Sequence, residues 1–247
     1  SMVRVGAFVA QHTPQIALPG GQDCGIAQAG WGLIAGKAYI GRIWLAGSKD
    51  AGPIRVSLVW GDGPNDRQTV TIPQVADAFA KTPLEFTAGK TTDDGRLEIT
   101  AAGQGRISVG TVSLMPADNV QGMRADTLAL LQELDSPVYR WPGGNFVSGY
   151  NWRDGIGDPD RRPPRKNPAW QGIEHNDMGL DEFMVFCRLL KTEPYIAVNS
   201  GLGEVQDAVD ELLYANGSPD TPQGKERAEN GHRDPYCVKF WSIGNEM

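Results

Sequence analysis

The side chains best suited to chemistry follow short apolar runs of the sequence. Arg140 and Asn145 flank a Trp-Pro-Gly-Gly segment, and Asn245 and Glu246 follow the apolar residues 240–243. If an apolar strand delivers Glu246 to the mouth of a partly dry pocket, burial disfavours ionisation and the carboxyl group becomes a candidate general acid. Asn245 offers a donor and an acceptor for a substrate hydroxyl group. By itself, the Gly-Asn-Glu triplet more often marks a capped strand end.

Two tryptophans lie among charged residues in the long segment between residues 146 and 179. We expect Trp152 and Trp170 to be exposed there. Indole rings beside guanidinium and carboxylate groups suit a polyhydroxylated ligand, because sugar C–H groups stack on the rings while hydroxyl groups find charged partners. The alternative is that both indoles pack the loop onto the rest of the domain and that the Arg-Lys run from Arg161 to Lys166 is merely solvated.

The elements that must position these residues are of the α/β type. Beyond residue 120 the apolar period changes from two to about 3.6, and helical and strand patterns alternate. We expect Asn176 or Asp177 to cap the second helix. Active sites form beyond the carboxyl ends of parallel strands, so the strand ends are the place to search. The predicted helices are 126–134, 180–191 and 205–214, and the predicted strands are 138–140, 194–198 and 238–243.

The preceding part of the chain is predicted to be all-β. Residues 26–115 are rich in Gly, Thr and Val, and short alternating runs stand between turn signals, which favours a β-sandwich or jelly roll. We therefore divide the chain into a β-rich module at 1–118 and an α/β part at 119–247, whose three successive units are fewer than the eight of a (β/α)8 barrel. The predicted strands of the module are 38–46, 54–60, 68–72, 84–87, 96–100 and 106–114.

Composition excludes several classes of protein. The 247 residues carry a net charge of −7, which argues against nucleic acid or an anionic membrane as partner. No apolar run approaches the roughly 20 residues of a membrane helix, and without a signal peptide a cytoplasmic location is favoured. Three distant cysteines and three scattered histidines form no metal motif, so neither a metal nor a cofactor is expected.

Read together, the motifs at the strand ends resemble the α-L-arabinofuranosidases of glycoside hydrolase family 51. The resemblance spans about residues 105–247, and the order of its motifs makes it more specific than any single one. The motifs are Arg140 to Gly157, Arg162-Pro163, Pro168-Ala169-Trp170, Glu174 to Asp177, Asp181 to Met184 and Gly244-Asn245-Glu246-Met247.

The resemblance implies that residues 1–118 are a carbohydrate-binding-like module and that residues 119–247 are a partial (β/α)8 barrel, about strands 2 to 4. It also implies a role for each site residue. Glu246 is expected to be the acid/base at the end of the fourth barrel strand. Arg140, Asn145 and Asn245 are expected to line the pocket of the sugar being cleaved, and Trp170 to border that pocket. The implied reaction is the retaining release of terminal α-L-arabinofuranosyl groups from arabinose-containing plant polysaccharides and oligosaccharides. The alternatives are an endo-acting β-glucanase or xylanase of the same family, or a non-catalytic carbohydrate-binding fragment.

Two features of the family have no counterpart in the sequence. The retaining mechanism needs a second glutamate about 5 to 5.5 Å from the acid/base, on the seventh strand, and that nucleophile lies outside this chain. Residues 1–25 also lack the family's first barrel strand with its sugar-binding glutamate. An open half-barrel leaves unpaired strand edges and an apolar lining. We therefore expect a second chain or a missing segment to complete the barrel, and we expect a homo-oligomer.

Overall fold

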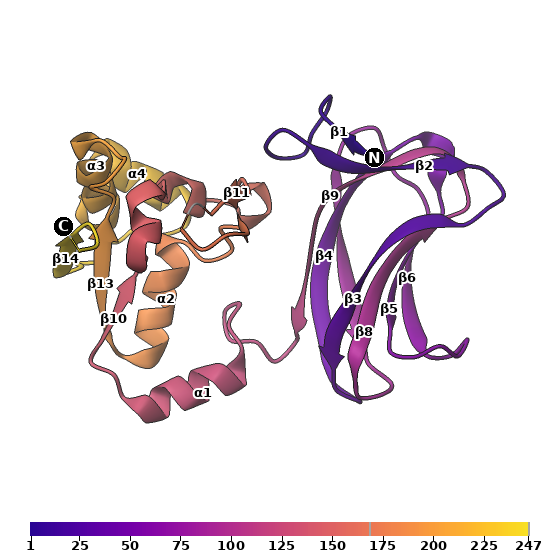
Figure 1. Ribbon diagram of the computed structural model, residues 1–247, viewed down its shortest axis with the longest axis horizontal. Coiled ribbons are helices and arrows are strands. Elements are labelled where there is room, and N and C mark those ends of the chain that lie inside the picture. Colours follow the sequence, from indigo (N-terminus) through magenta and orange to yellow (C-terminus); the bar gives the residue numbers. More distant parts are fainter. Residues whose placement is uncertain (168, 247) are drawn as a thin grey trace. The chain divides into compact units, whose positions relative to one another are not determined.

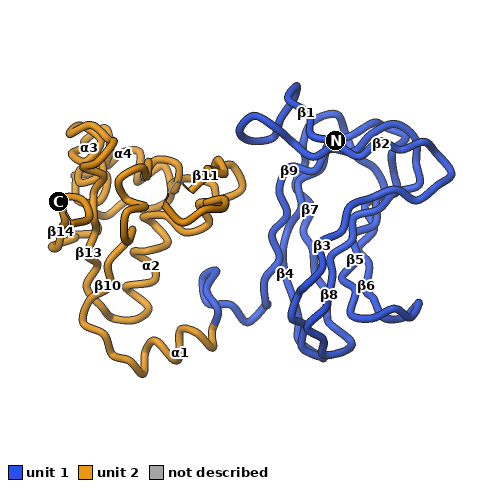
Figure 2. The backbone as a smooth tube through the Cα atoms, viewed as in Figure 1, with its two compact units in different colours: residues 1–124 blue, residues 125–247 orange. Residues whose placement is uncertain are grey.

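The computed structural model describes residues 1–167 and 169–246, and the chain divides into two units, Ser1–Arg124 and Ala125–Met247 (Figure 2). Pro168 and Met247, which belong to two of the motifs above, lie outside the described residues.

The first unit consists of two antiparallel sheets (Figure 1). One sheet has the strand order β1-β2-β9-β4-β7 and the other the order β3-β8-β5-β6. The β-rich character predicted for this part is confirmed. The strands are β1 (Met2–Val3), β2 (Thr13–Pro19), β3 (Cys24–Leu33), β4 (Ala38–Gly47), β5 (Ile54–Val59), β6 (Arg67–Ile72), β7 (Ala80–Thr87), β8 (Thr92–Ala101) and β9 (Gln104–Pro116), and a 3-10 turn, η1, covers Lys49–Ala51.

Alternating side chains hold the two sheets together. Ile43 and Leu45 of β4 belong to one sheet, Val56 and Leu58 of β5 belong to the other, and all four are buried in one apolar core. Successive side chains of a strand point to opposite faces, so this period of two places every second residue between the sheets. Strand β9 ends at Pro116, as expected for a residue that cannot donate to a ladder.

The β structure begins earlier than the sequence predicted. Strands β2 and β3 start at Thr13 and Cys24, before the expected beginning near residue 26. Strand β2 has two prolines, and β3 is rich in glycine and mostly exposed. Their pairing with β9 and β8 overrides this weak local preference for strand.

The second unit is built on a three-stranded parallel sheet with the order β10-β13-β14. The register places Trp141 beside Ile196 and Ile196 beside Trp241. The three strands match those predicted near 138–140, 194–198 and 238–243. Their bounds are β10 (Val138–Trp141), β13 (Glu193–Val198) and β14 (Phe240–Ile243), and a small antiparallel pair is formed by β11 (Arg165–Lys166) and β12 (Ile173–Glu174).

Helix α2 packs against this sheet (Figure 1). Phe183 and Met184 of α2 share a core with Ile196 of β13, and Trp141 and Trp241 pack against that core. A helix missing from the sequence prediction, α4, follows α3. The helices are α1 (Ala125–Leu134), α2 (Leu180–Leu190), α3 (Val205–Asn216) and α4 (Pro222–Glu229), and the 3-10 turns are η2 (Gly144–Gly149), η3 (Trp152–Gly155) and η4 (Pro159–Arg161).

The predicted cap of α2 is wrong. The helix begins after Gly179, whose backbone N–H donates to Glu182 Oε2 at 2.8 Å. Asn176 is buried instead, and its Nδ2 donates to the carbonyl of Pro163 at 2.7 Å. A glutamate at the third helical position can bond the N-terminal backbone, so an Asn or Asp cap is not required. The amide of Asn176 holds the long loop instead.

Candidate active site

The carboxyl ends of the three parallel strands bring the predicted site residues together. Because β10, β13 and β14 run in the same direction, the segments after Trp141, Val198 and Ile243 emerge at one edge of the sheet. The N–H of Gly244 donates to the carbonyl of Val198 at 3.1 Å. The turn after β14 is therefore tied to the neighbouring strand before the chain reaches Asn245.

Asn245 links the first and third strand ends. Its Oδ1 accepts a hydrogen bond from Arg140 Nη2 at 3.2 Å, and its Nδ2 donates to Asn145 Oδ1 at 3.0 Å. These residues are about 100 positions apart in the sequence, so the contact exists only because β10 and β14 flank β13. The structure thus gathers Arg140, Asn145 and Asn245 in one polar cluster, which can bind a ligand with several hydroxyl groups.

Trp170 lies over the turn that carries Asn145. A Cβ atom added at Gly144 would be 2.7 Å from Cζ2 of Trp170, and Gly144 has a φ of +60°. Only glycine permits both that backbone conformation and so close an approach. The indole is 63% exposed, in agreement with the predicted exposure of this tryptophan. It therefore borders the polar cluster with an aromatic surface open to solvent.

Glu246 follows this cluster, but the expected burial around it is wrong. The side chain of Glu246 is exposed, whereas the sequence argument places it in a partly dry pocket. The reason is its position on the sheet: in the described part of the chain β14 is paired on one side only, with β13. Ile243, at the end of the same strand, is 78% exposed. The described residues provide no wall on that side.

Trp152 does not have the predicted exposure. It is 3% exposed, and its Nε1 donates to the carbonyl of Asp207 at 3.1 Å. The guanidinium of Arg153 stacks on its ring at 4.4 Å and also donates to Asp210 and Glu226. For Trp152 the alternative interpretation holds, since the indole packs the loop onto α3.

Arg162 and Arg165 of the long loop have structural roles. Arg162 is buried and donates to both carboxylate oxygens of Glu182, at 2.8 and 2.9 Å. Arg165 pairs in the same way with Asp154, at 2.7 and 2.9 Å. Bidentate pairs of this kind fix a loop in one geometry. These two arginines therefore already have carboxylate partners, and they are not merely solvated.

The side chain of Asn199, just after β13, forms hydrogen bonds with backbone groups. Its Oδ1 accepts from the N–H groups of Gly201, Leu202 and Gly203, and its Nδ2 donates to the carbonyl of Tyr150. These four bonds to backbone groups are those of an ordinary turn. Sequence reasoning missed Glu211, a glutamate at a buried position of α3. The helical spacing could have predicted this burial, because residue 211 falls on the inward stripe of that helix with Tyr214 and Ala215.

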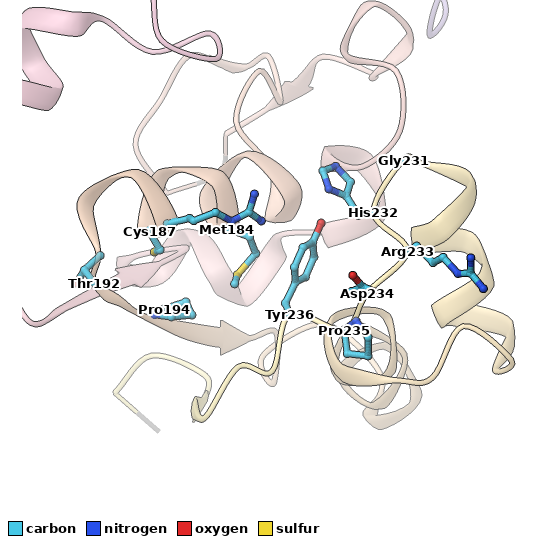
Figure 3. A pocket seen from close by; sticks show the side chains of 11 residues that line it. Met184, Cys187, Thr192, Pro194, Gly231, His232, Arg233, Asp234, Pro235 and Tyr236 are labelled. Carbon is cyan, nitrogen blue, oxygen red and sulfur yellow. The ribbon is translucent and has the colours of Figure 1, made fainter.

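A cavity of about 490 Å³ lies at the opposite end of β13, beside Thr192 and Pro194. Figure 3 shows His232 and Tyr236 on the side of this cavity facing Met184 of α2, while Arg233 points away from them. In parallel α/β sheets the amino ends of the strands contribute to stability, and chemistry takes place at the carboxyl ends. This cavity is therefore separate from the candidate site.

No group of three or more His, Cys, Asp or Glu side chains in residues 1–167 and 169–246 is arranged to hold a metal ion. Within the same residues, none of the helices has the length and apolar character of a membrane span.

Comparison with known proteins shows which family the second unit is similar to. The sequence profile of the family "Alpha-L-arabinofuranosidase 1 domain" matches residues 130–247. The resemblance to the family 51 α-L-arabinofuranosidases is confirmed. The intracellular exo-α-(1→5)-L-arabinofuranosidase of Bifidobacterium longum is 46% identical over 132 residues, which are 53% of this chain and 23% of that protein. The chain spans about a quarter of the length of the curated arabinofuranosidases it matches.

Solved structures of family 51 α-L-arabinofuranosidases are also similar to this chain. The Thermotoga maritima α-L-arabinofuranosidase, in complex with arabinose, is 47% identical, with a TM-score of 0.51 over 52% of this chain and 27% of that one. An arabinose-bound GH51 α-L-arabinofuranosidase aligns over 99% of this chain and 46% of its own, with a TM-score of 0.86 and 22% identity. The second comparison shows that both units have the fold found in an arabinofuranosidase of this family.

Proposed function

We propose that the protein containing this chain is a retaining glycoside hydrolase that releases terminal α-L-arabinofuranosyl groups from arabinose-containing polysaccharides and oligosaccharides. The observation that carries the proposal is the hydrogen-bonded cluster of Arg140, Asn145 and Asn245 at the carboxyl ends of β10 and β14, directly before Glu246. Relatives named as arabinofuranosidases, one of them exo-acting, support the substrate class.

In this proposal the cluster orients the sugar and Glu246 transfers protons. The Glu246 carboxyl group donates a proton to the glycosidic oxygen as the C–O bond breaks. A second carboxylate, outside this chain, forms the bond to the anomeric carbon. Glu246 then takes a proton from water as the water oxygen bonds to the same carbon and the bond from that carbon to the second carboxylate breaks. This step releases arabinose, leaves Glu246 protonated again and frees the second carboxylate. No cofactor enters the reaction.

The three parallel strands are proposed to be strands 2 to 4 of a (β/α)8 barrel. Further strands, from another segment or another chain, would pair with β14 and surround Glu246, supplying the burial that a general acid needs. We also propose that the first unit is a carbohydrate-binding module. The whole protein is proposed to be cytoplasmic.

The experiment uses the full protein that contains this chain. With Glu246→Gln, we expect activity on α-1,5-linked arabino-oligosaccharides to fall by about 10²- to 10⁴-fold. Activity on a nitrophenyl arabinofuranoside should fall less, because nitrophenolate departs without a proton. Glu133→Gln, at an exposed glutamate of α1, is the matched control.

Unchanged turnover of the oligosaccharides by Glu246→Gln would contradict the assignment. Product analysis separates the alternatives: free L-arabinose indicates exo action, whereas shortened β-glucan or xylan chains indicate an endo enzyme. Carbohydrate binding without any turnover by the unmodified protein would identify a binding fragment.

A further inference from the structure

A buried carboxyl group that the proposed reaction does not use lies on helix α3. Glu211 is only 2% exposed, and its Oε1 has no hydrogen-bond partner. Buried polar atoms are nearly always paired, and one left unpaired carries the full cost of losing its water. Desolvation raises the pKa of Glu211 to about 8, so the carboxyl group is protonated at neutral pH. An unpaired buried acid is a group that a ligand can satisfy.

Glu211 lines a cavity of about 310 Å³ at the carboxyl-end side of the sheet. The walls come from the loop after β10, the loop after β13 and the first turns of α3. This volume is at the lower end of the range for small-molecule sites, about 300 to 1,000 Å³, which suits one sugar ring. Tyr150, Trp152, Arg153, Asn199 and Asp207 also line this cavity.

The walls are held in place before any ligand arrives. Trp152 Nε1 bonds the carbonyl of Asp207, and the Asn199 side chain bonds the backbone at Tyr150 and at Gly201, as described above. Cross-links of this kind between the two loops and α3 keep the cavity from collapsing onto Glu211. A preformed site binds a small ligand without the entropic cost of ordering its loops.

Most charged groups around the cavity already have partners. The Arg153 guanidinium pairs with Asp210 and Glu226, and the Asp207 carboxylate accepts the N–H of Glu204. Besides Glu211, the hydroxyl group of Tyr150 is buried without a partner. A protonated carboxyl group and a phenol each donate one hydrogen bond and accept others. This donor and acceptor set matches a neutral ligand with several hydroxyl groups.

We propose that the cavity between α3 and the loops after β10 and β13 is a second saccharide site, separate from the cluster at Asn245, in which Glu211 and Tyr150 bind the hydroxyl groups of one sugar unit. The site follows from the unpaired groups and the cavity, and it does not require Glu246 to be catalytic. The proposed substrate of the enzyme serves only to choose the probe.

The test is a titration of the full protein with L-arabinose, followed by the indole N–H signals in NMR. The Trp152 indole reports the second site, because it bonds the cavity wall, and the Trp170 indole reports the surface beside Gly144. We expect the Trp152 signal to shift saturably in the unmodified protein and in Glu211→Gln, whose amide also donates and accepts. Glu211→Leu, which removes the unpaired group, should weaken this binding by about tenfold or more.

Glu229→Gln, at an exposed glutamate of α4, is the control and should bind as the unmodified protein does. The proposal is overturned if the Trp152 signal does not respond to arabinose, or if Glu211→Leu responds as the unmodified protein does. A response to methylammonium that Glu211→Gln abolishes would show a cation site and would also overturn it. If arabinose shifts the Trp152 signal but not the Trp170 signal, the proposed function is weakened and the second site stands.

Discussion

Single residues at the candidate site act through long-range contacts. Asn245 both accepts from Arg140 and donates to Asn145, so one amide sets the orientation of two side chains from another strand end. The adjacent Glu246 is exposed. Glu211, by contrast, is buried, and its Oε1 has no hydrogen-bond partner. The burial of Glu211 leads to a prediction about the stability of the fold.

Burial of Glu211 should make stability depend on pH. Its pKa rises from 4.5 to about 8 on folding, so between these values the folded state keeps a proton that the unfolded state has lost. The free energy of unfolding should therefore fall as pH rises from about 5 to 8, by up to about 1.4 kcal/mol per pH unit from this group. Denaturant unfolding of Glu211→Gln over this range should show a flatter dependence.

The control for this measurement is Glu229→Gln, whose side chain is well exposed. It should retain the pH dependence of the unmodified protein. Equal slopes for Glu211→Gln and the unmodified protein would contradict the assignment of the proton to Glu211.

At the scale of elements, the turns after the strands complete the positioning of the candidate site. The Gly143-Gly144 turn carries Asn145 from β10 toward Asn245 and leaves space for Trp170. The loop that follows is fixed by the pairs Arg162–Glu182 and Arg165–Asp154. A precise site on a loop needs such supports, because loops are otherwise the mobile part of a fold.

The two glycines of this turn make a matched pair of variants. Gly144→Ala places a Cβ atom 2.7 Å from the Trp170 ring in a backbone conformation of φ +60° that alanine disfavours. In the full protein we expect displacement of Trp170 and about a tenfold rise in KM for arabino-oligosaccharides, equivalent to about 1.4 kcal/mol of binding. At Gly143, φ is −111° and no atom lies within 4 Å of an added Cβ.

Gly143→Ala should therefore keep the KM of the unmodified protein. Similar KM values for both variants would show that the position of Trp170 over Gly144 does not matter for substrate binding.

At the scale of the whole chain, the two units have separate cores. The members of one apolar cluster all fall within residues 1–124, and those of the other all fall within residues 125–246. The second unit also presents apolar side chains at its parallel sheet. Ile243 is 78% exposed, and Val138 and Phe240 are exposed as well. An apolar sheet edge with unpaired backbone groups invites further strands.

We predict that residues 1–247 expressed alone associate with one another. Light scattering after gel filtration should give a mass above the 26.7 kDa of one chain. Ile243→Lys should reduce this association, because a charged side chain on an edge strand opposes pairing. Leu130→Lys, at an exposed position of α1, is the control and should have little effect. A single-chain mass with cooperative unfolding would reject the prediction.

The sequence alone determined the class of most elements and the motif content. Among residues 1–167 and 169–246, the sequence patterns predicted most strands and three of the four α-helices, because a half-buried strand or helix must repeat its apolar residues with its own geometry. It also determined the family resemblance, since ordered motifs need no coordinates.

Only the tertiary structure decided which of these residues meet and which are buried. The bond between Asn145 and Asn245 depends on the sheet order β10-β13-β14, and the local sequence carries no information about it. Burial likewise depends on what packs from elsewhere, so Trp152 was predicted exposed and is buried, while Glu246 was predicted part-buried and is exposed. Periodicity is a local property of the chain, whereas contact and solvent exclusion arise between distant segments.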